Sequence, residues 1–239
     1  MAHHPRRTAL SISALLLAVL TSCTTTHPKT SADAAHPSGT RSSGTSSDSS
    51  AGPSGGVTLA QGPGPQKKYT AQAQPSADSC HYRYDHDQPL PDAGCTPGAV
   101  SPAVTQATLA TTICRSGGYT GGIRPPGNIT DREKAANAKS YGYTGPLHDA
   151  EYDHLISLQL GGDPNDPRNL WVEPPSPGHK AGAGPNNPKD AVETRLHTAI
   201  CKNQVTLVAA QQAIATDWET AEQVLGLKPD PGDASGPSD

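Results

Sequence analysis

An adjacent carboxylic acid and imidazole, Asp153 and His154, are the side chains of this sequence best suited to activating water. An imidazole titrates close to neutrality, so His154 could take a proton from water at physiological pH. Hydrolysis with such a base can also use a cation that stabilises the charge developing on the substrate and on the leaving oxygen. The carboxylate of Asp153 is a suitable ligand for such a cation. The pair alone is a weak signal, because neighbouring Asp and His residues also occur by chance in loops.

The elements predicted around this pair give it more weight. Residues 151–160 are rich in Leu and Ile and predict a strand, and a dense Gly, Pro, Asn and Asp turn signal follows at 161–167. Residues 169–173 predict a second, short strand, and residues 174–188 can hold little regular structure. The order of elements is therefore that of a β-hairpin with a long loop after it.

A helix is predicted directly after this loop. Asn187 is a good helix cap, and Pro188 suits the first position of a helix. Val192, Leu196 and Ile200 then recur every four residues, as one buried face of a helix requires. A further helix, or a pair of helices, is predicted between residues 207 and 225, and an earlier helix between 131 and 141.

The predicted helix also carries a polar face. Asp190, Glu193 and His197 lie three and then four residues apart, so they share one side of the helix, away from its apolar stripe. His197 lies some ~10 Å further along the axis than Asp190, so one cation cannot reach both ends. We expect Asp190 and Glu193 to be metal ligands ahead of His197. The alternative is a solvated face with an ion pair between Lys189 and Glu193.

These segments together resemble the His-Asn-His nucleases, whose ββα-metal fold has the same order of elements. The matching residues are Glu151-Tyr152-Asp153-His154-Leu155-Ile156, Gly161-Gly162, Asn169-Leu170-Trp171, Lys189-Asp190, Glu193, His197 and Cys201. The resemblance extends from about residue 90 to residue 218. It implies that Asp153 binds the metal ion, that His154 is the general base, and that Asn169 holds the hairpin and orients His154.

The third metal ligand is where this chain departs from the family pattern. The family usually places a His or an Asn on the helix, whereas this helix begins with the carboxylates Asp190 and Glu193. His179 in the preceding loop is closer to where the last His of the family falls, but the Gly and Pro residues around it favour a surface position. A site rich in oxygen ligands suits Mg2+ or Mn2+ better than Zn2+.

Two functions follow as hypotheses. The first is a metal-dependent endonuclease that cuts extracellular DNA or RNA, with nucleic acid as its substrate. The second is a non-catalytic surface module that keeps the fold, which the net charge of −4 and the absence of a basic patch make plausible. A zinc peptidase is disfavoured, because the His-Glu-x-x-His pattern is absent. We expect a monomer.

The N-terminus predicts export. Arg6 and Arg7 precede an apolar run over residues 9–20, which is typical of a secretory signal and too short to span a bilayer of ~30 Å. Leu-Thr-Ser-Cys at residues 20–23 resembles a bacterial lipobox, which implies cleavage before Cys23 and lipidation of its thiol. We therefore expect a protein anchored to the outer side of the membrane through a lipid on Cys23, without a transmembrane helix.

Composition divides the rest of the chain. Hydrophobic residues make up 33% and Phe is absent, so a core must be concentrated in part of the sequence. Segments rich in Ser, Thr, Gly and Pro cannot bury enough apolar surface to fold. The predicted parts are a signal peptide at 1–22, a lipidated and disordered linker at 23–77, a nuclease-like domain at 78–227 and a disordered tail at 228–239. The fold class is α+β: a small, mostly helical domain around a ββα-metal core.

Four further cysteines lie in the predicted domain. Cys80, Cys95, Cys114 and Cys201 suggest two disulfides in an exported protein, with three possible connectivities. We favour Cys80–Cys95 with Cys114–Cys201, which would tie the front of the domain to its last helices. A structural zinc site is the alternative, although no Cys-x2-Cys spacing is present.

Overall fold

The computed structural model describes residues 58–185 and 187–228. The chain divides into two units, residues 1–50 and 51–239, and the described residues all belong to the second. The predicted signal peptide, the lipidation site Cys23, the linker up to residue 57 and the tail from residue 229 lie outside the described residues.

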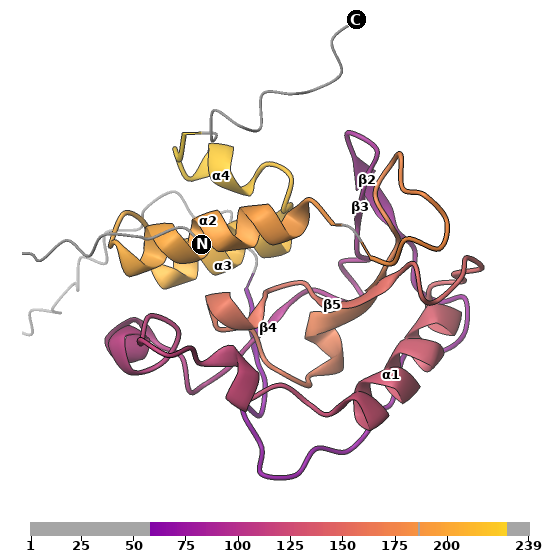
Figure 1. Ribbon diagram of the computed structural model, residues 1–239, viewed down its shortest axis with the longest axis horizontal. Helices are drawn as coiled ribbons and strands as arrows, with labels where there is room; N and C mark the ends of the chain where they lie inside the picture. The colour runs from indigo at the N-terminus through magenta and orange to yellow at the C-terminus, as the bar shows by residue number, and fades with distance from the viewer. Residues whose placement is uncertain (1–57, 186, 229–239) are drawn as a thin grey trace, which may run out of the picture. The chain divides into compact units, whose positions relative to one another are not determined.

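The described part combines short strands with helices, which agrees with the α+β class (Figure 1). Its strands are β1 Ala60–Gln61, β2 Arg83–Asp85, β3 Gln88–Leu90, β4 Ala99–Val100, β5 Glu151–His154 and β6 Leu170–Glu173. Its α-helices are α1 Gly127–Ser140, α2 Lys189–Cys201, α3 Leu207–Thr216 and α4 Ala221–Val224. Short 3-10 helices lie between these elements, at Gln106–Thr111, Thr120–Gly122, Leu158–Leu160 and Pro167–Asn169.

The predicted hairpin is formed by β5 and β6, which pair in antiparallel fashion. Glu151 lies opposite Glu173, and Asp153 lies opposite Trp171. Opposite residues of an antiparallel pair share a face, and successive residues alternate between faces. The side chains of Glu151, Asp153 and Glu173 therefore share one face of the hairpin, and His154 belongs to the other. β5 ends at His154, earlier than the predicted strand, because the chain turns there toward a 3-10 turn.

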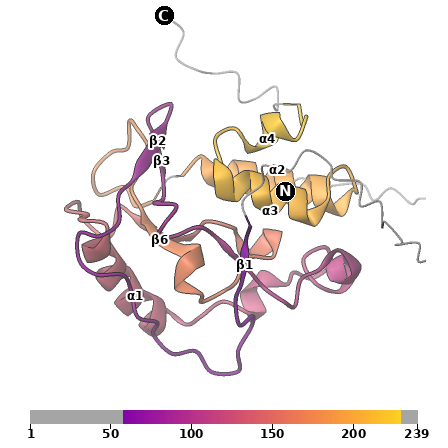
Figure 2. The same cartoon turned by 180° about the vertical axis from the view of Figure 1, so that it is seen from behind.

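The hairpin lies between α1 and α2 (Figures 1 and 2). On one side α1 packs against β6, and Asn137 Oδ1 accepts a hydrogen bond of 2.8 Å from Val172 N. On the other side α2 packs against α3 and α4. The predicted apolar stripe of α2, Val192, Leu196 and Ile200, is buried as expected. Hairpin and helix are thus fixed by packing from both sides, which holds their polar groups in place.

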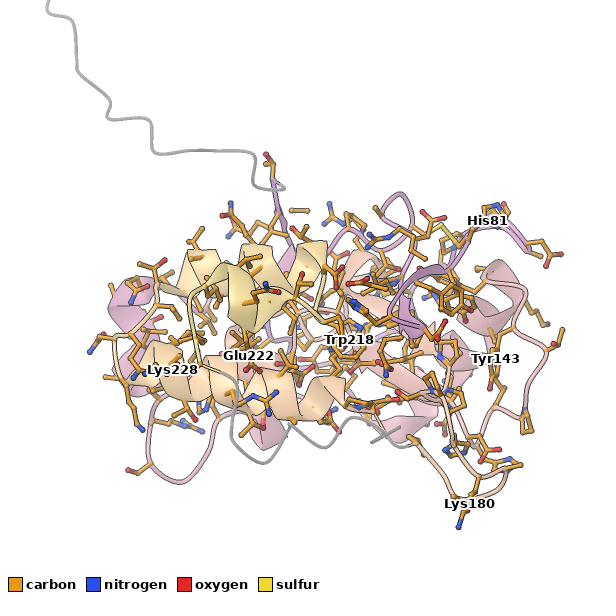
Figure 3. All side chains as sticks on the ribbon, turned by 90° about the horizontal axis from the view of Figure 1, so that it is seen from above. His81, Tyr143, Lys180, Trp218, Glu222 and Lys228 are labelled. Carbon is orange, nitrogen blue, oxygen red and sulfur yellow. A yellow bond between two sulfur atoms is a disulfide. The ribbon has the colours of Figure 1, made fainter. Side chains whose placement is uncertain are left out.

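Two tryptophans anchor the core. Trp171 and Trp218 are both buried, as expected for core residues. Trp218 lies inside the packed body (Figure 3), and its indole Nε1 donates a hydrogen bond of 2.9 Å to Pro89 O. That bond satisfies the only polar group of the ring.

Helix α1 begins earlier than predicted. Thr130-Asp131-Arg132-Glu133 has the pattern of a capping box, which predicts Glu133 in the first turn of the helix, but the helix begins at Gly127. Glu133 is buried and accepts a hydrogen bond of 2.7 Å from Gln72 N. A contact between segments distant in sequence thus uses the side chain that local reasoning had assigned to capping.

The folded part also begins earlier than the predicted boundary at residue 78. Ala60 of β1 pairs with Ala99 of β4, and Asn165 Nδ2 donates a hydrogen bond of 3.0 Å to Thr70 O. Residues 58–77 are therefore tied to the domain mostly through backbone groups. Composition did not predict this, because backbone pairing leaves no apolar signature in the sequence.

Two disulfides link the described residues, Cys80–Cys95 and Cys114–Cys201, and this is the favoured connectivity. The second bond joins the last residue of α2 to a segment 87 residues earlier. Within residues 58–185 and 187–228, no helix has the length and apolarity needed to cross a membrane.

Candidate functional site

The gap between the hairpin and the start of α2 is filled by an ammonium group. Lys189 Nζ donates hydrogen bonds of 2.7 Å to Asp153 Oδ2, 2.5 Å to Glu193 Oε1 and 3.0 Å to His154 O. Its side chain is only 1% exposed. Asp153 and Glu193 do face each other across one cation, but that cation is Lys189 rather than the metal ion expected between them. The ion pair of Lys189 with Glu193 is present, but it is buried and does not lie on the solvated face that the alternative predicts.

Electrostatics keep this lysine charged. Burial alone would lower the pKa of Lys189, because an ammonium loses its hydration. Asp153 and Glu193 outweigh that effect and raise the pKa above its ordinary value. A charged Lys189 is therefore a fixed part of the site at any physiological pH.

Two more carboxyl groups lie on the same face of the hairpin. Glu173 is fully buried, and neither of its oxygens has a hydrogen-bond partner. Burial, followed by the charge of Asp153, raises its pKa well above the ordinary value. Burial and Asp153 also raise the pKa of Glu151 to about 7. Glu173 therefore keeps its proton to a higher pH than an ordinary glutamate does.

His154 is held as a neutral base. Its Nε2 lies 3.0 Å from Pro164 O, and a carbonyl oxygen can only accept, so Nε2 carries the proton. Burial lowers the pKa of His154 to about 4. The ring is therefore uncharged at neutral pH, and Nδ1 keeps its lone pair. This is the protonation state and the tautomer that a general base needs.

Asn169 fixes the loop that carries the partner of His154. Its Oδ1 accepts a hydrogen bond of 3.0 Å from Ile156 N, and its Nδ2 donates bonds of 3.0 Å to Ile156 O and Asp163 O. These bonds hold the two ends of the hairpin connection together. They reach backbone groups and not the imidazole, so Asn169 positions His154 only through the loop next to Pro164.

Asn187 is a polar residue of the site that the sequence suggested only as a helix cap. Pro188 is the cap in the structure, and Asn187 Nδ2 donates a hydrogen bond of 3.0 Å to Glu151 Oε2. Its Oδ1 is buried without a partner, which is costly for an amide oxygen. The signal that could have found it is its place directly before the predicted helix.

The other predicted candidates lie elsewhere. Asp190 is exposed in the first turn of α2, where burial and Asp153 raise its pKa. His197 lies near the other end of the helix, with its Nε2 2.9 Å from Ile113 O. His179 lies in the loop after β6, with its Nε2 3.4 Å from Asp149 Oδ1. Neither histidine bonds to the cluster around Lys189.

A second group of possible ligands lies at the end of α2. Each of three residues, Cys114, His197 and Cys201, offers one ligand atom. These three atoms lie within 4.8 Å of one another, a spacing that could hold a metal ion. Among the described residues this is the single set of three or more His, Cys, Asp and Glu side chains that meets this spacing. The two sulfurs are joined in a disulfide, which leaves His197 as the available ligand.

Comparisons with known proteins add no relative. No family model, no curated protein and no solved structure matches this chain. Its function therefore has to be argued from the groups described above.

Proposed function

We propose that this chain is a metal-dependent endonuclease that hydrolyses phosphodiester bonds in extracellular DNA or RNA, with His154 as the general base. The observation that carries the proposal is the bond between His154 Nε2 and Pro164 O in a ring whose pKa is lowered to about 4. A neutral imidazole with a fixed tautomer presents Nδ1 as a proton acceptor. Such a base contributes about 10²–10⁴-fold to the rate of hydrolysis.

Oxygen atoms of the hairpin and of the residue before α2 fit a hard divalent cation. Asp153 Oδ2 accepts a hydrogen bond from Lys189, which leaves Oδ1 as a possible metal ligand. Asn187 Oδ1 is buried without a hydrogen-bond partner. Mg2+ typically keeps several waters and takes one or two carboxylates together with substrate phosphate, so few protein ligands suffice. The cation would stabilise the charge that develops on the phosphate and on the leaving oxygen. Oxygen donors favour Mg2+ or Mn2+ over Zn2+.

This proposal gives Glu193 a different role from the one expected. Its Oε1 accepts from Lys189, and its Oε2 lies 3.3 Å from Gln159 Nε2. Glu193 therefore holds the lysine, and the lysine holds Asp153 in place. Asp190, more exposed at the start of α2, remains a candidate for contacts to the hydrated cation.

A cleavage assay tests the proposal. The purified chain is incubated with plasmid DNA and with single-stranded RNA in Mg2+ or Mn2+, and EDTA is added to a parallel sample. We expect cleavage that EDTA abolishes and that His154→Ala reduces by about 10²–10⁴-fold. His148→Ala is the matched control, because that imidazole is 67% exposed. Intact substrates with the wild-type chain, or equal rates for His154→Ala and wild type, would overturn the proposal.

The second candidate function is a non-catalytic surface module, and one observation favours it. Lys189 already pairs with both Asp153 and Glu193, so the cluster has a counter-charge without any added ion. Such a module should bind no divalent cation by calorimetry and should cosediment with cell-wall polymer. The endonuclease should instead bind Mn2+, and Asn187→Ala should weaken that binding.

We also propose that the chain works outside the cell, tethered by a lipid on Cys23. The two disulfides support an oxidising compartment, where such bonds persist. Replacing Cys23 with Ser should move the protein from the membrane fraction to the medium of the producing cells. A mature wild-type chain without a lipid on its first residue would contradict the tether.

A further inference from the structure

The end of α2 carries a cluster that the proposed nuclease does not use. Cys201 is the last residue of the helix, and His197 precedes it by one turn on the same face. Cys114 reaches the same point from the segment after the first 3-10 turn. The cluster lies about 18 Å along the helix from Lys189, so it is separate from the site at the other end.

The spacing within the cluster matches that of a tetrahedral metal site. His197 Nε2 lies 3.5 Å from Cys201 Sγ. Zinc bonds of about 2.3 Å to sulfur and about 2.0–2.1 Å to nitrogen, at a tetrahedral angle, separate those two atoms by roughly 3.5 Å. Once the disulfide is broken, the two sulfurs need to separate to roughly 3.8 Å to complete a tetrahedral face. Side-chain rotation can supply that movement without unwinding the helix.

The cluster can be reached by reductants and by ions. Cys114, His197 and Cys201 are each partly exposed. His197 Nε2 carries its proton toward Ile113 O, 2.9 Å away, and that proton has to move to Nδ1 before Nε2 can bind a metal ion. Three protein ligands leave a fourth position for water, as in exchangeable zinc sites.

We propose that the Cys114–Cys201 disulfide is the closed form of a redox-controlled site for a thiophilic divalent ion of the zinc class. A dithiol reductant transfers two electrons and two protons to the disulfide, so the chain gains two thiols and the reductant becomes a disulfide. Binding of the ion by both sulfurs then releases the two thiol protons to water. The ion replaces the covalent bond as the link between the end of α2 and Cys114.

The inference is independent of the proposed nuclease and also applies to a chain without catalytic activity. An exported chain is made in a reducing compartment, where thiols persist, and is oxidised after transfer. Both states of the cluster are thus within reach of the same protein. Thiolate ligands select zinc-class ions, whereas the carboxylates near Lys189 select magnesium-class ions.

The test is a titration with Co2+ as a spectroscopic probe for Zn2+. A chain with Cys23, Cys80 and Cys95 all replaced by Ser is used, so that only Cys114 and Cys201 remain. Oxidised and reduced samples are compared, and thiolate-to-cobalt absorption in the near ultraviolet is followed together with circular dichroism. We expect one thiolate-bound Co2+ per reduced chain, displaced by Zn2+, and no thiolate signal from the oxidised chain.

A variant of His197 tests whether this histidine is one of the metal ligands. His197→Asn should weaken binding to the reduced chain by more than about tenfold, because even outer-shell partners of metal sites cost 10–100-fold. Affinity unchanged in this variant would overturn the three-ligand site. So would a reduced chain that shows no thiolate-to-cobalt signal. If reduction unfolds the chain and Zn2+ does not restore its circular dichroism, the proposal is overturned as well.

Discussion

The two ends of helix α2 are fixed to the rest of the molecule by different chemistry. At its start, Lys189 joins the helix to β5 through its ion pair with Asp153, and Glu193 of the same helix also pairs with the ammonium. At its end, Cys201 joins the helix to Cys114 through a covalent bond. The first link depends on the protonation of its groups and the second on the redox state.

This difference shows where chemistry can take place. Buried ion pairs are strongly desolvated, and their net contribution to stability is small unless a partner is lost. They are therefore suited to holding groups in a defined charge state rather than to adding stability. A disulfide adds stability mainly by restricting the unfolded chain. We infer that the disulfide end contributes more to stability and that the lysine end holds the groups around it in a defined charge state.

The largest expected loss of stability follows from removal of the disulfide at the end of α2. Replacing Cys114 and Cys201 together by Ser should lower the free energy of unfolding by about 4–5 kcal/mol, against about 3 kcal/mol for Cys80 and Cys95. The reason is loop length, since the separations are 87 and 15 residues. Urea unfolding of both double variants measures the two losses. A larger loss for Cys80 and Cys95 would mean that native packing, not loop closure, sets the stability.

The next largest loss of stability is expected from replacement of Lys189 at the start of α2. Lys189→Met should lower the free energy of unfolding at pH 7 by about 4 kcal/mol, because Asp153 and Glu193 are left without their cation. The loss should shrink in acid, because burial raises the pKa of Glu193 and its carboxylate takes up a proton there. Urea unfolding at pH 7 and at pH 4.5 measures both values.

Lys202→Met is the matched control for Lys189→Met. Lys202 directly follows the same helix and is exposed, so its loss should change stability by no more than about 0.5 kcal/mol. Equal losses at Lys189 and Lys202 would show that the buried cation is not needed, and the comparison between the two ends would fail.

The apolar framework could be predicted from the sequence, and the charge pairing could not. The period of Val192, Leu196 and Ile200 placed α2 correctly, because burial of one helix face leaves a regular pattern. The spacing of Asp190, Glu193 and His197 showed only that they share a face. It could not show that Lys189 would point into the interior, because a lysine next to carboxylates is usually solvated.

The hairpin shows the same limit. Asp153, His154 and Asn169 were placed on the expected strands or at their ends. The role of Asn187 was missed, since its unpartnered amide oxygen is a feature of the tertiary structure. No local pattern encodes which buried group lacks a partner.

Acid should lower the free energy of unfolding through protonation of His154. Its folded pKa of about 4 is below the unfolded value of about 6.5, so the unfolded chain takes up the proton first. Stability should therefore fall as pH drops from about 6.5 to about 4, by up to about 3 kcal/mol. His154→Asn should lack this part of the loss, as unfolding curves at several pH values would show. An unchanged slope in the variant would mean that His154 is not held neutral.

The smallest effect concerns Glu173, whose buried carboxyl has a raised pKa. The folded chain keeps its proton at a pH where the unfolded chain has lost it, so Glu173 makes stability decrease as pH rises above about 4.3. Glu173→Gln keeps the shape without a titrating group, and it should become increasingly more stable than wild type between pH 5 and pH 8.

Glu222→Gln provides the contrast for this last variant. Glu222 of α4 is labelled in Figure 3, and its carboxylate accepts a hydrogen bond from Arg195 on α2. Its replacement should lose stability at pH 8, whereas Glu173→Gln should gain it. A gain in both variants would indicate a general effect of removing negative charge. A loss in Glu173→Gln would mean that Glu173 is ionised beside Lys189, so that Lys189 neutralises a third carboxylate and Asp153 has no proton donor next to it.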